Sequence, residues 1–445
     1  MRTEVNATQN TLTGVREPVD LVVAVDVGSA RVACAVAELN GDKPPKVLAA
    51  ESAASFGIRA GEIVDLKRAS EAIRIAIAAA ADRAEADVKT VVVGLSGDVK
   101  LSNAKVGLDL DRERRLVTPN DLNRLRNAIS AEPGPGRRII HRFDGPFSVG
   151  DLHGLEQPEG LSGDRLEMHA AFLTAASDRL DNVLRAVRGA DVEIEAVALE
   201  PMACSLGALT VDERALGAAV LDFGAGAFRG ALWEGGRLRQ IHVVGKESGP
   251  VQSQSGRISG TLAPAGGMDG VTMAIARRFR IAPATAARLL RTHATLDESG
   301  LSSLPAAVDV AAVDGLGSVR VETLELSRTL EELLSPAVRS MREGLSGFSN
   351  GHAVGVVLTG GSAKIRGMAA WVSKRFGGAP VRVGVPMWRV AEGVEIPAEL
   401  DGCTACSLSG LLLLGAEGRK GLRYRRVSGY YNRFMDGLRR FVASL

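Results

Sequence analysis

The chain has 445 residues, which is more than a single hydrophobic core usually serves, so we expect two lobes. Its composition, 46% hydrophobic and 24% charged, is that of a globular protein. The formal net charge is only +2. Such a small charge gives no field that would attract nucleic acid, so no nucleic-acid partner is expected and any attraction to a charged surface must be local.

The cysteines and the apolar runs exclude further classes of protein. The only close cysteine pair, Cys403 and Cys406, lacks the second pair or the histidine that a zinc site needs, and we interpret all four cysteines as free cytosolic thiols. Residues 1–19 are polar, without the apolar core of a secretory signal, and are expected to form a disordered tail. No apolar run reaches the roughly eighteen residues needed to cross a bilayer, which favours a soluble body.

The first part of the chain has the pattern of an α/β lobe. Leu21 to Asp26 is an apolar run followed by a glycine turn and a second β-rich run, 32–37, which predicts two strands joined by a tight turn. The alanine-rich segment 69–86 predicts a buried helix, and 90–95 predicts a parallel-type strand. The more charged, loop-rich segment 99–172 indicates an inserted α+β subdomain.

A second α/β unit follows. The run 217–222 again ends on an acid that glycines follow, and the Gly-, Ser-, Gln- and Pro-rich stretch after Val244 is expected to be a loop up to Gly270. The other predicted elements are helices at 178–188, 270–279, 283–292 and 324–344, strands at 192–198 and 353–359, and a helix starting near 367.

Three apolar strands end in glycine-containing turns: Asp26-Val27-Gly28-Ser29, Asp222-Phe223-Gly224-Ala225-Gly226 and Thr359-Gly360-Gly361-Ser362. Because glycine has no Cβ, such tips let backbone N–H groups surround a phosphate. The acids Asp26 and Asp222 stand where they could hold Mg²⁺ directly or through water. One such turn is more often an ordinary loop. Two of them in separate lobes, with a Gly-Gly turn, favour a nucleotide held in a cleft between the lobes.

The order of these motifs resembles that of the actin, Hsp70 and sugar-kinase superfamily. Residues 26–31 and 221–226 are similar to its two phosphate loops, and 357–363 to its adenosine loop. Within the superfamily the chain most resembles the FtsA family of bacterial actin-like cell-division proteins, through residues 158–167 in the insert and 209–217 before the second phosphate strand.

The resemblance implies an actin-like two-lobe α/β ATPase fold that binds ATP and Mg²⁺. The implied nucleotide-binding residues are Asp26, Gly28, Ser29, Ala30, Arg31, Asp222, Gly224, Ala225, Gly226, Arg288, Gly360, Gly361 and Ser362. Asp26 and Asp222 would hold the metal, and Glu200 would position water near the terminal phosphate. Residues 406–415 would form a hinge helix between the lobes.

The expected segments follow from the same resemblance. They are a first-lobe core at 20–98, 173–208 and 403–416, the insert at 99–172, a second-lobe core at 209–247 and 325–402, a second-lobe subdomain at 248–324, a basic linker at 417–429 and an amphipathic helix at 430–445. The insert would make subunit contacts between copies of the chain. The second-lobe subdomain would receive the C-terminal tail of FtsZ, the tubulin-like ring protein.

The second phosphate loop departs from the family pattern Asp-x-Gly-Gly-Gly-Thr-x-Asp at three positions, because it reads Asp222-Phe-Gly-Ala-Gly-Ala-Phe-Arg229. Relative to that pattern, a hydroxyl and a carboxylate are lost and an arginine is gained. We therefore expect fewer side-chain contacts to magnesium and its waters, and at most a weak ATPase activity. Arg229 either pairs with phosphate or points to solvent. In relatives, one helix offers an acid and a lysine to the ribose. The corresponding residues here, 286–291, include no acid.

The C-terminal end has the pattern of an amphipathic helix. Its apolar residues recur at steps of three and four, at Tyr431, Phe434, Met435, Leu438, Phe441, Val442 and Leu445. Arg433, Arg439 and Arg440 lie beside this stripe, and residues 416–445 carry eight basic and two acidic residues, a net charge of 8 − 2 = +6. This combination predicts a helix lying in an anionic lipid surface. The alternative is a helix packed on the protein's own core.

These features favour an ATP-binding adaptor that polymerises at the division site on the cytoplasmic face of the inner membrane, anchors FtsZ filaments and recruits later division proteins. A small-molecule phosphotransferase of the same superfamily is a second hypothesis, and the degenerate second loop argues against it. A pilus-assembly type of actin-like scaffold is a third, and the terminal helix argues against it.

Overall fold

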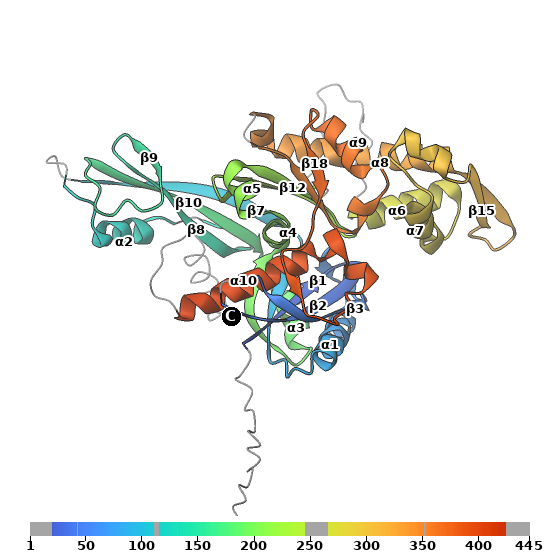
Figure 1. Cartoon of the computed structure of the whole chain (residues 1–445), viewed down its shortest axis with the longest axis horizontal. Helices are drawn as coiled ribbons and strands as arrows, with labels where there is room; N and C mark the ends of the chain where they lie inside the picture. The colour runs from blue at the N-terminus through green and yellow to red at the C-terminus, as the bar shows by residue number, and fades with distance from the viewer. Residues whose placement is uncertain are drawn as a thin grey trace, which may run out of the picture.

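The computed structural model describes residues 20–41, 43–110, 115–130, 132–244, 266–350 and 353–423. In this part of the chain, two α/β lobes lie one above the other in Figure 1, and an elongated insert extends to one side. The predicted two-lobe α/β fold with an inserted α+β subdomain is confirmed.

The first lobe is a six-stranded sheet in the order β11-β6-β1-β2-β3-β19. Its strands are β1 (Leu21–Val27), β2 (Arg31–Glu38), β3 (Lys46–Ala54), β6 (Thr90–Leu95), β11 (Glu193–Leu199) and β19 (Arg389–Val390). A small hairpin, β4 (Ile58–Arg59) and β5 (Glu62–Ile63), follows β3. The helices are α1 (Leu66–Arg83), α3 (Ser177–Arg188) and α10 (Cys406–Arg423), and α1 packs on β2 and β3 while α10 packs on β1 and β6. Consecutive buried residues in the central strands require cover on both faces of the sheet.

Two details of the first lobe differ from the expectation. Helix α1 starts three residues early, at Leu66, because the side chain of Asp65 accepts a hydrogen bond from the Arg68 N–H and caps the helix. Strand β19 lies within the segment 325–402 that we expected in the second lobe, yet it pairs in parallel with β3. The chain therefore crosses back to the first lobe before α10 begins.

The insert is a four-stranded sheet, β7-β10-β8-β9, covered by one helix. Its elements are β7 (Val99–Asp109), α2 (Pro119–Ala128), β8 (Arg137–Val149), β9 (Leu152–Leu155) and β10 (Arg165–Ala176). Phe147, Leu166 and Phe172 belong to a hydrophobic cluster of its own, so the insert has a core separate from that of the lobe.

The second lobe repeats the topology of the first. Its sheet, β14-β13-β12-β17-β18, has an antiparallel β12-β13-β14 meander flanked by parallel strands, as β1-β2-β3 is flanked by β6 and β11. The strands are β12 (Ala218–Phe223), β13 (Phe228–Glu234), β14 (Arg237–Val244), β17 (Val356–Thr359) and β18 (Val381–Val383). Helices α8 (Thr323–Gly344) and α9 (Met368–Arg375) complete the core. Two lobes of like topology bring their hairpin tips, and so the glycine turns, to one cleft.

The subdomain at the outer end of the second lobe is small. It contains α6 (Gly267–Phe279), α7 (Pro283–Thr292), a 3₁₀ turn (Glu298–Ser303), and the hairpin β15 (Ala307–Ala311) and β16 (Ser318–Glu322). Helix α6 begins inside the stretch that was expected to be a loop up to Gly270; residues 245–265 of that stretch lie outside the described part.

Helix α4 (Glu200–Ala208) leads from the first lobe to the second, and it lies in contact with α10. The short helix α5 (Val211–Leu216) continues from α4 into the second lobe. The expected linker 417–429 is wrong in its first part, because α10 continues to Arg423. The rest of that linker and all the predicted membrane residues, 431–445, lie outside the described residues, as does the expected tail 1–19.

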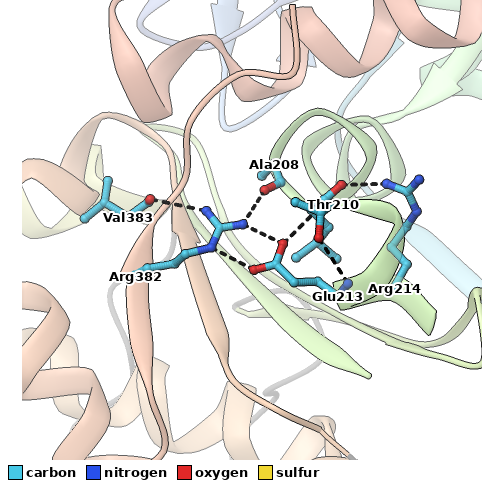
Figure 2. A network of polar contacts seen from close by, with 7 residues as sticks. Ala208, Thr210, Glu213, Arg214, Arg382 and Val383 are labelled. Carbon is cyan, nitrogen blue, oxygen red and sulfur yellow. Dashed lines mark hydrogen bonds and ion pairs between the residues drawn. The ribbon is translucent and has the colours of Figure 1, made fainter. Parts of the chain in front are cut away.

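A polar network fastens α5 to β18 (Figure 2). The Arg382 guanidinium donates to both carboxylate oxygens of Glu213, at 2.8 and 2.7 Å, and to the Ala208 carbonyl at 2.7 Å. Glu213 also forms the capping box of α5 with Thr210. The connection between the lobes is thus tied to the edge of the second sheet. No helix in the described ranges is long and apolar enough to span a bilayer.

Candidate functional site: the cleft between the lobes

A cavity of about 510 Å³ lies between the lobes, a volume typical of small-molecule sites. Its walls come from the turns that follow β1, β12 and β17, from α6 and α7, and from the start of α10. All of the predicted nucleotide-binding residues except Arg288 line it, and so does Glu200.

The first hairpin turn is tightly folded. A Cβ on Gly28 would lie 2.8 Å from the Arg31 carbonyl oxygen, so only glycine fits there. Ser55 donates to the Gly28 carbonyl, and the Ser29 hydroxyl accepts from the Gly61 N–H, each at 2.8 Å. Among the described residues, the Arg31 Nη1 atom is buried with no hydrogen-bond partner. The turn is therefore held in place by its neighbours and presents a guanidinium to the cavity.

In the second hairpin, Arg229 stands directly opposite Asp222 across β12 and β13. Its Nη1 atom donates to Asp222 Oδ2 at 2.9 Å, and the residues are each only 6% exposed. Thr359, the parallel neighbour of Asp222 on β17, donates to the other oxygen, Oδ1, at 3.2 Å. The expectation that Arg229 points to solvent is wrong, because the register of the hairpin directs it onto Asp222. Its pairing with phosphate stays a prediction.

The two hairpin tips meet each other. A Cβ on Gly226 would lie 2.2 Å from Ser29 Oγ, so the loops of the two lobes touch. The second tip also holds the start of α6, because the Met268 N–H donates to the Gly224 carbonyl. Three segments far apart in sequence thereby close one end of the cavity.

A cluster of acids lies beneath the tips. Glu200 is 4% exposed and accepts from the Ser407 hydroxyl at 2.9 Å through Oε2. Burial, with the neighbouring carboxylate of Asp26, raises the pKa of Glu200 well above its usual range. Burial also raises the pKa of Asp26, although the hydrogen bond from Glu200 counteracts this. Of the two acids, Glu200 has the more strongly raised pKa, so it is the one that favours the protonated form.

The third turn lies against the same acid. Gly360 has φ of 83°, and a Cβ there would lie 2.7 Å from Asp222 Oδ1, so this position requires glycine on both counts. Gly361 and Ser362 follow it in a short 3₁₀ turn and line the cavity.

Helix α7 presents Arg291 to the cavity, together with Ala287 and Leu290. Arg288 is exposed and does not line it, so the assignment of Arg288 is corrected. Sequence reasoning also missed Asp269, Thr272 and Lys364. The Gly266-Gly267 doublet that opens α6 is the sequence signal that could have indicated the first two.

The magnesium assignment fits poorly at the second hairpin. Within the described ranges, no group of three or more His, Cys, Asp or Glu side chains is arranged to hold a metal ion. Both Asp222 oxygens already accept hydrogen bonds, one of them from a cation. Of the two predicted metal ligands, Asp26 is the one that remains for a metal carried in with a ligand.

The charge balance of the cavity suits an anion. Four cationic side chains line it, Arg31, Arg229, Arg291 and Lys364, against four carboxyl groups, Asp26, Glu200, Asp222 and Asp269. The pKa of Glu200 is raised well above its usual range, which reduces the negative charge that opposes the cations. The glycine turns add backbone N–H groups without Cβ atoms to obstruct them.

This fold and this cleft define an actin-like protein. Among solved structures, the chain is similar to PilM in a PilM–PilN type IV pilus biogenesis complex, with a TM-score of 0.57 and 19% identity over 89% of this chain and 98% of the other. It is also similar to MreB5 of Spiroplasma citri bound to ADP, with a TM-score of 0.52 and 12% identity over 91% and 98%. These likenesses concern the fold.

Sequence comparison finds similarity to FtsA. Residues 97–174 match the model of the SHS2 domain inserted in FtsA. The cell division protein FtsA of Escherichia coli K12 is 27% identical over 82% of this chain and 84% of its own length. The FtsA of Neisseria meningitidis is 26% identical over 88% and 91%, and that of Borreliella burgdorferi 25% over 93% and 95%. The chain is an actin-like cell-division protein, similar to FtsA over most of its length.

Proposed function

We propose that the cleft binds ATP, with the phosphates at the two hairpin tips and the adenosine between the Gly360 turn and helices α6 and α7. The carrying observation is that three glycine turns and two buried guanidinium groups converge on one cavity of about 510 Å³. Arg31 and the backbone N–H groups of the tips would bind phosphate oxygens. The nucleotide bound by the MreB5 structure supports this choice of ligand class.

Mg²⁺ would enter with the nucleotide, whose phosphates supply most of its ligands. When bound, it would neutralise phosphate charge. Of the two predicted metal ligands, Asp26, near the end of β1, is the carboxylate that could face it. We propose binding without assigning a fast hydrolytic step.

Titration of the purified chain with ATP, monitored by calorimetry, tests nucleotide binding. Replacing Arg31→Ala should weaken binding about tenfold or more, because a charge-assisted contact to phosphate is lost. Arg288→Ala is the matched control, since this arginine lies off the cavity, and it should leave the Kd unchanged. Wild-type protein that binds no ATP would refute the proposal.

We further propose that copies of the chain polymerise on the cytoplasmic face of the inner membrane. Residues 430–445 would form the anchor, and their apolar stripe and arginines support this. A single such helix binds reversibly. A polymer with many anchors holds far more tightly, which gives a physical reason to join a filament-forming body to a weak tail.

Sedimentation with liposomes tests the anchor. The full chain should sediment with anionic vesicles and much less with neutral ones, and a variant ending at residue 430 should lose this binding. A chain with Phe434→Glu and Phe441→Glu should behave like the truncated one, since it keeps the length but not the apolar stripe. Equal sedimentation of all three would exclude the tail as the anchor.

The same adaptor would attach FtsZ filaments through the second-lobe subdomain and recruit later division proteins. The similarity to FtsA supports this proposal. Co-sedimentation of the intact chain with FtsZ filaments tests it, with FtsZ lacking its C-terminal tail as the control. Equal binding of both forms would refute the tail as the ligand.

A further inference from the structure

We propose that Arg229 takes the place of a protein-held divalent cation at the second phosphate loop, so that this chain binds nucleotide without requiring Mg²⁺. The inference rests on the proposed nucleotide binding and adds to it the source of the positive charge. The observation behind it is that the surroundings of Asp222 do not fit its predicted role as a magnesium ligand.

Asp222 is fully engaged by side chains of its own lobe. Its Oδ2 atom accepts from Arg229 at 2.9 Å and its Oδ1 atom accepts from Thr359 at 3.2 Å. Thr359 is completely buried, and the other two residues nearly so. A metal ion bound directly to this carboxylate would lie within a few ångströms of the guanidinium, and like charges at such a distance repel strongly where water is scarce.

Arg229 has donors left over for a ligand. It lines the cavity, and its Nε atom is buried without a hydrogen-bond partner among the described residues. On the facing hairpin, the Nη1 atom of Arg31 is likewise buried without a hydrogen-bond partner among the described residues. A planar guanidinium matches the geometry of phosphate oxygens, and its charge persists at any physiological pH. The pair can therefore flank a polyphosphate from both lobes.

The strand register shows that a cation stands opposite the aspartate in the second hairpin but not in the first. Asp26 of the first hairpin stands opposite Ala33, at the position that corresponds to Arg229 opposite Asp222. Only one of the two like positions carries an arginine, and the loop before it, residues 222–229, contains no hydroxyl side chain and no acid besides Asp222. The competing explanation is an ion pair that serves folding alone, and the experiment must separate the two.

The primary measurement uses the unmodified full chain. ATP affinity is determined by calorimetry in excess Mg²⁺ and in excess EDTA, and the two Kd values should agree within about threefold. Binding in Mg²⁺ that disappears in EDTA would overturn the inference while leaving the proposed function intact. Absence of binding in both buffers would overturn the proposed function, and the inference with it.

A charge-neutral double variant, Asp222→Asn with Arg229→Gln, avoids an unpaired buried charge. In EDTA its Kd for ATP should rise about tenfold or more relative to wild type, and Mg²⁺ should restore part of the loss. The matched control is Arg278→Gln with Glu332→Gln, an exposed ion pair away from the cavity, which should change neither Kd. A double variant that binds ATP in EDTA as wild type does would assign Arg229 to folding and overturn the inference.

Discussion

Gly207 of α4 lies so close to Cys406 of α10 that a Cβ on the glycine would be 1.8 Å from the Cys406 carbonyl oxygen. The contact is reciprocal, because a Cβ on Gly410 would be 1.8 Å from the Ala203 carbonyl oxygen. Helices α4 and α10 thus meet backbone to backbone. Glycine is required here by the close approach of the helices.

Gly207→Ala should force α4 and α10 apart and destabilise the protein by about 3 kcal/mol or more, at the upper end of the range for overpacking. Denaturant unfolding followed by circular dichroism measures this. Gly361→Ala is the control, because its Cβ would meet only a Thr404 methyl at 3.7 Å and should cost little. Equal unfolding free energies for the two variants would contradict the observed crossing.

Glu200→Gln should stabilise the protein at neutral and alkaline pH. The raised pKa of Glu200 means that the native state keeps a proton that the unfolded chain releases above pH ~4.5, so the unfolding free energy of wild type falls as pH rises. The slope is about 1.4 kcal/mol per pH unit until the native pKa is reached. Glutamine keeps a donor toward Asp26 and an acceptor for Ser407 but cannot ionise.

The measurement is denaturant unfolding of both proteins from pH 4 to pH 8. The two curves should coincide near the acidic end and diverge above it, with the variant more stable. A wild type that is the more stable protein at pH 8 would mean that Glu200 is ionised in the native state.

Asp121 should anchor the insert. It is 2% exposed and accepts two hydrogen bonds from Arg115, at 2.6 and 2.8 Å, besides capping α2 through Thr118. The Arg115 guanidinium holds the pKa of this carboxyl well below its usual range. Asp121→Asn should therefore cost about 2 kcal/mol at neutral pH.

The pH dependence of that cost has a definite sign. A lowered native pKa gives stability that is complete above the unfolded pKa, near pH ~4, and is lost as the pH falls below it. The difference in unfolding free energy between wild type and Asp121→Asn should therefore shrink from pH 6 to pH 3. Asn123→Ala, an exposed position on the same helix, is the control, and a constant difference would contradict the assignment.

The Arg382–Glu213 pair should couple α5 to β18 (Figure 2). A double-mutant cycle with Arg382→Gln and Glu213→Gln should give an interaction energy of about 1 kcal/mol, above a typical exposed pair because the contact is bidentate. Both side chains are partly exposed, so the coupling should weaken at high salt. Strictly additive effects would mean that the pair does not fasten the connection.

Local patterns in the sequence predicted most of the architecture. Apolar runs that end in Gly28, Gly224 and Gly360 located the strands and turns around the cleft, because strand propensity and glycine's freedom act over a few residues. The predicted helix ends were less accurate. Helix α1 starts directly after its capping residue, Asp65, and α6 starts where its first backbone N–H groups donate to carbonyls of the second hairpin turn.

Contacts between distant segments decided the rest. The direction of Arg229 depended on the register of its hairpin, which pairs it with Asp222, and the choice of Arg291 over Arg288 depended on how α7 is rotated toward the cavity. The return of β19 to the first sheet required a partner, β3, more than three hundred residues earlier. Turns and strands are set by neighbours along the chain, whereas these three features exist only once segments far apart in sequence have packed together.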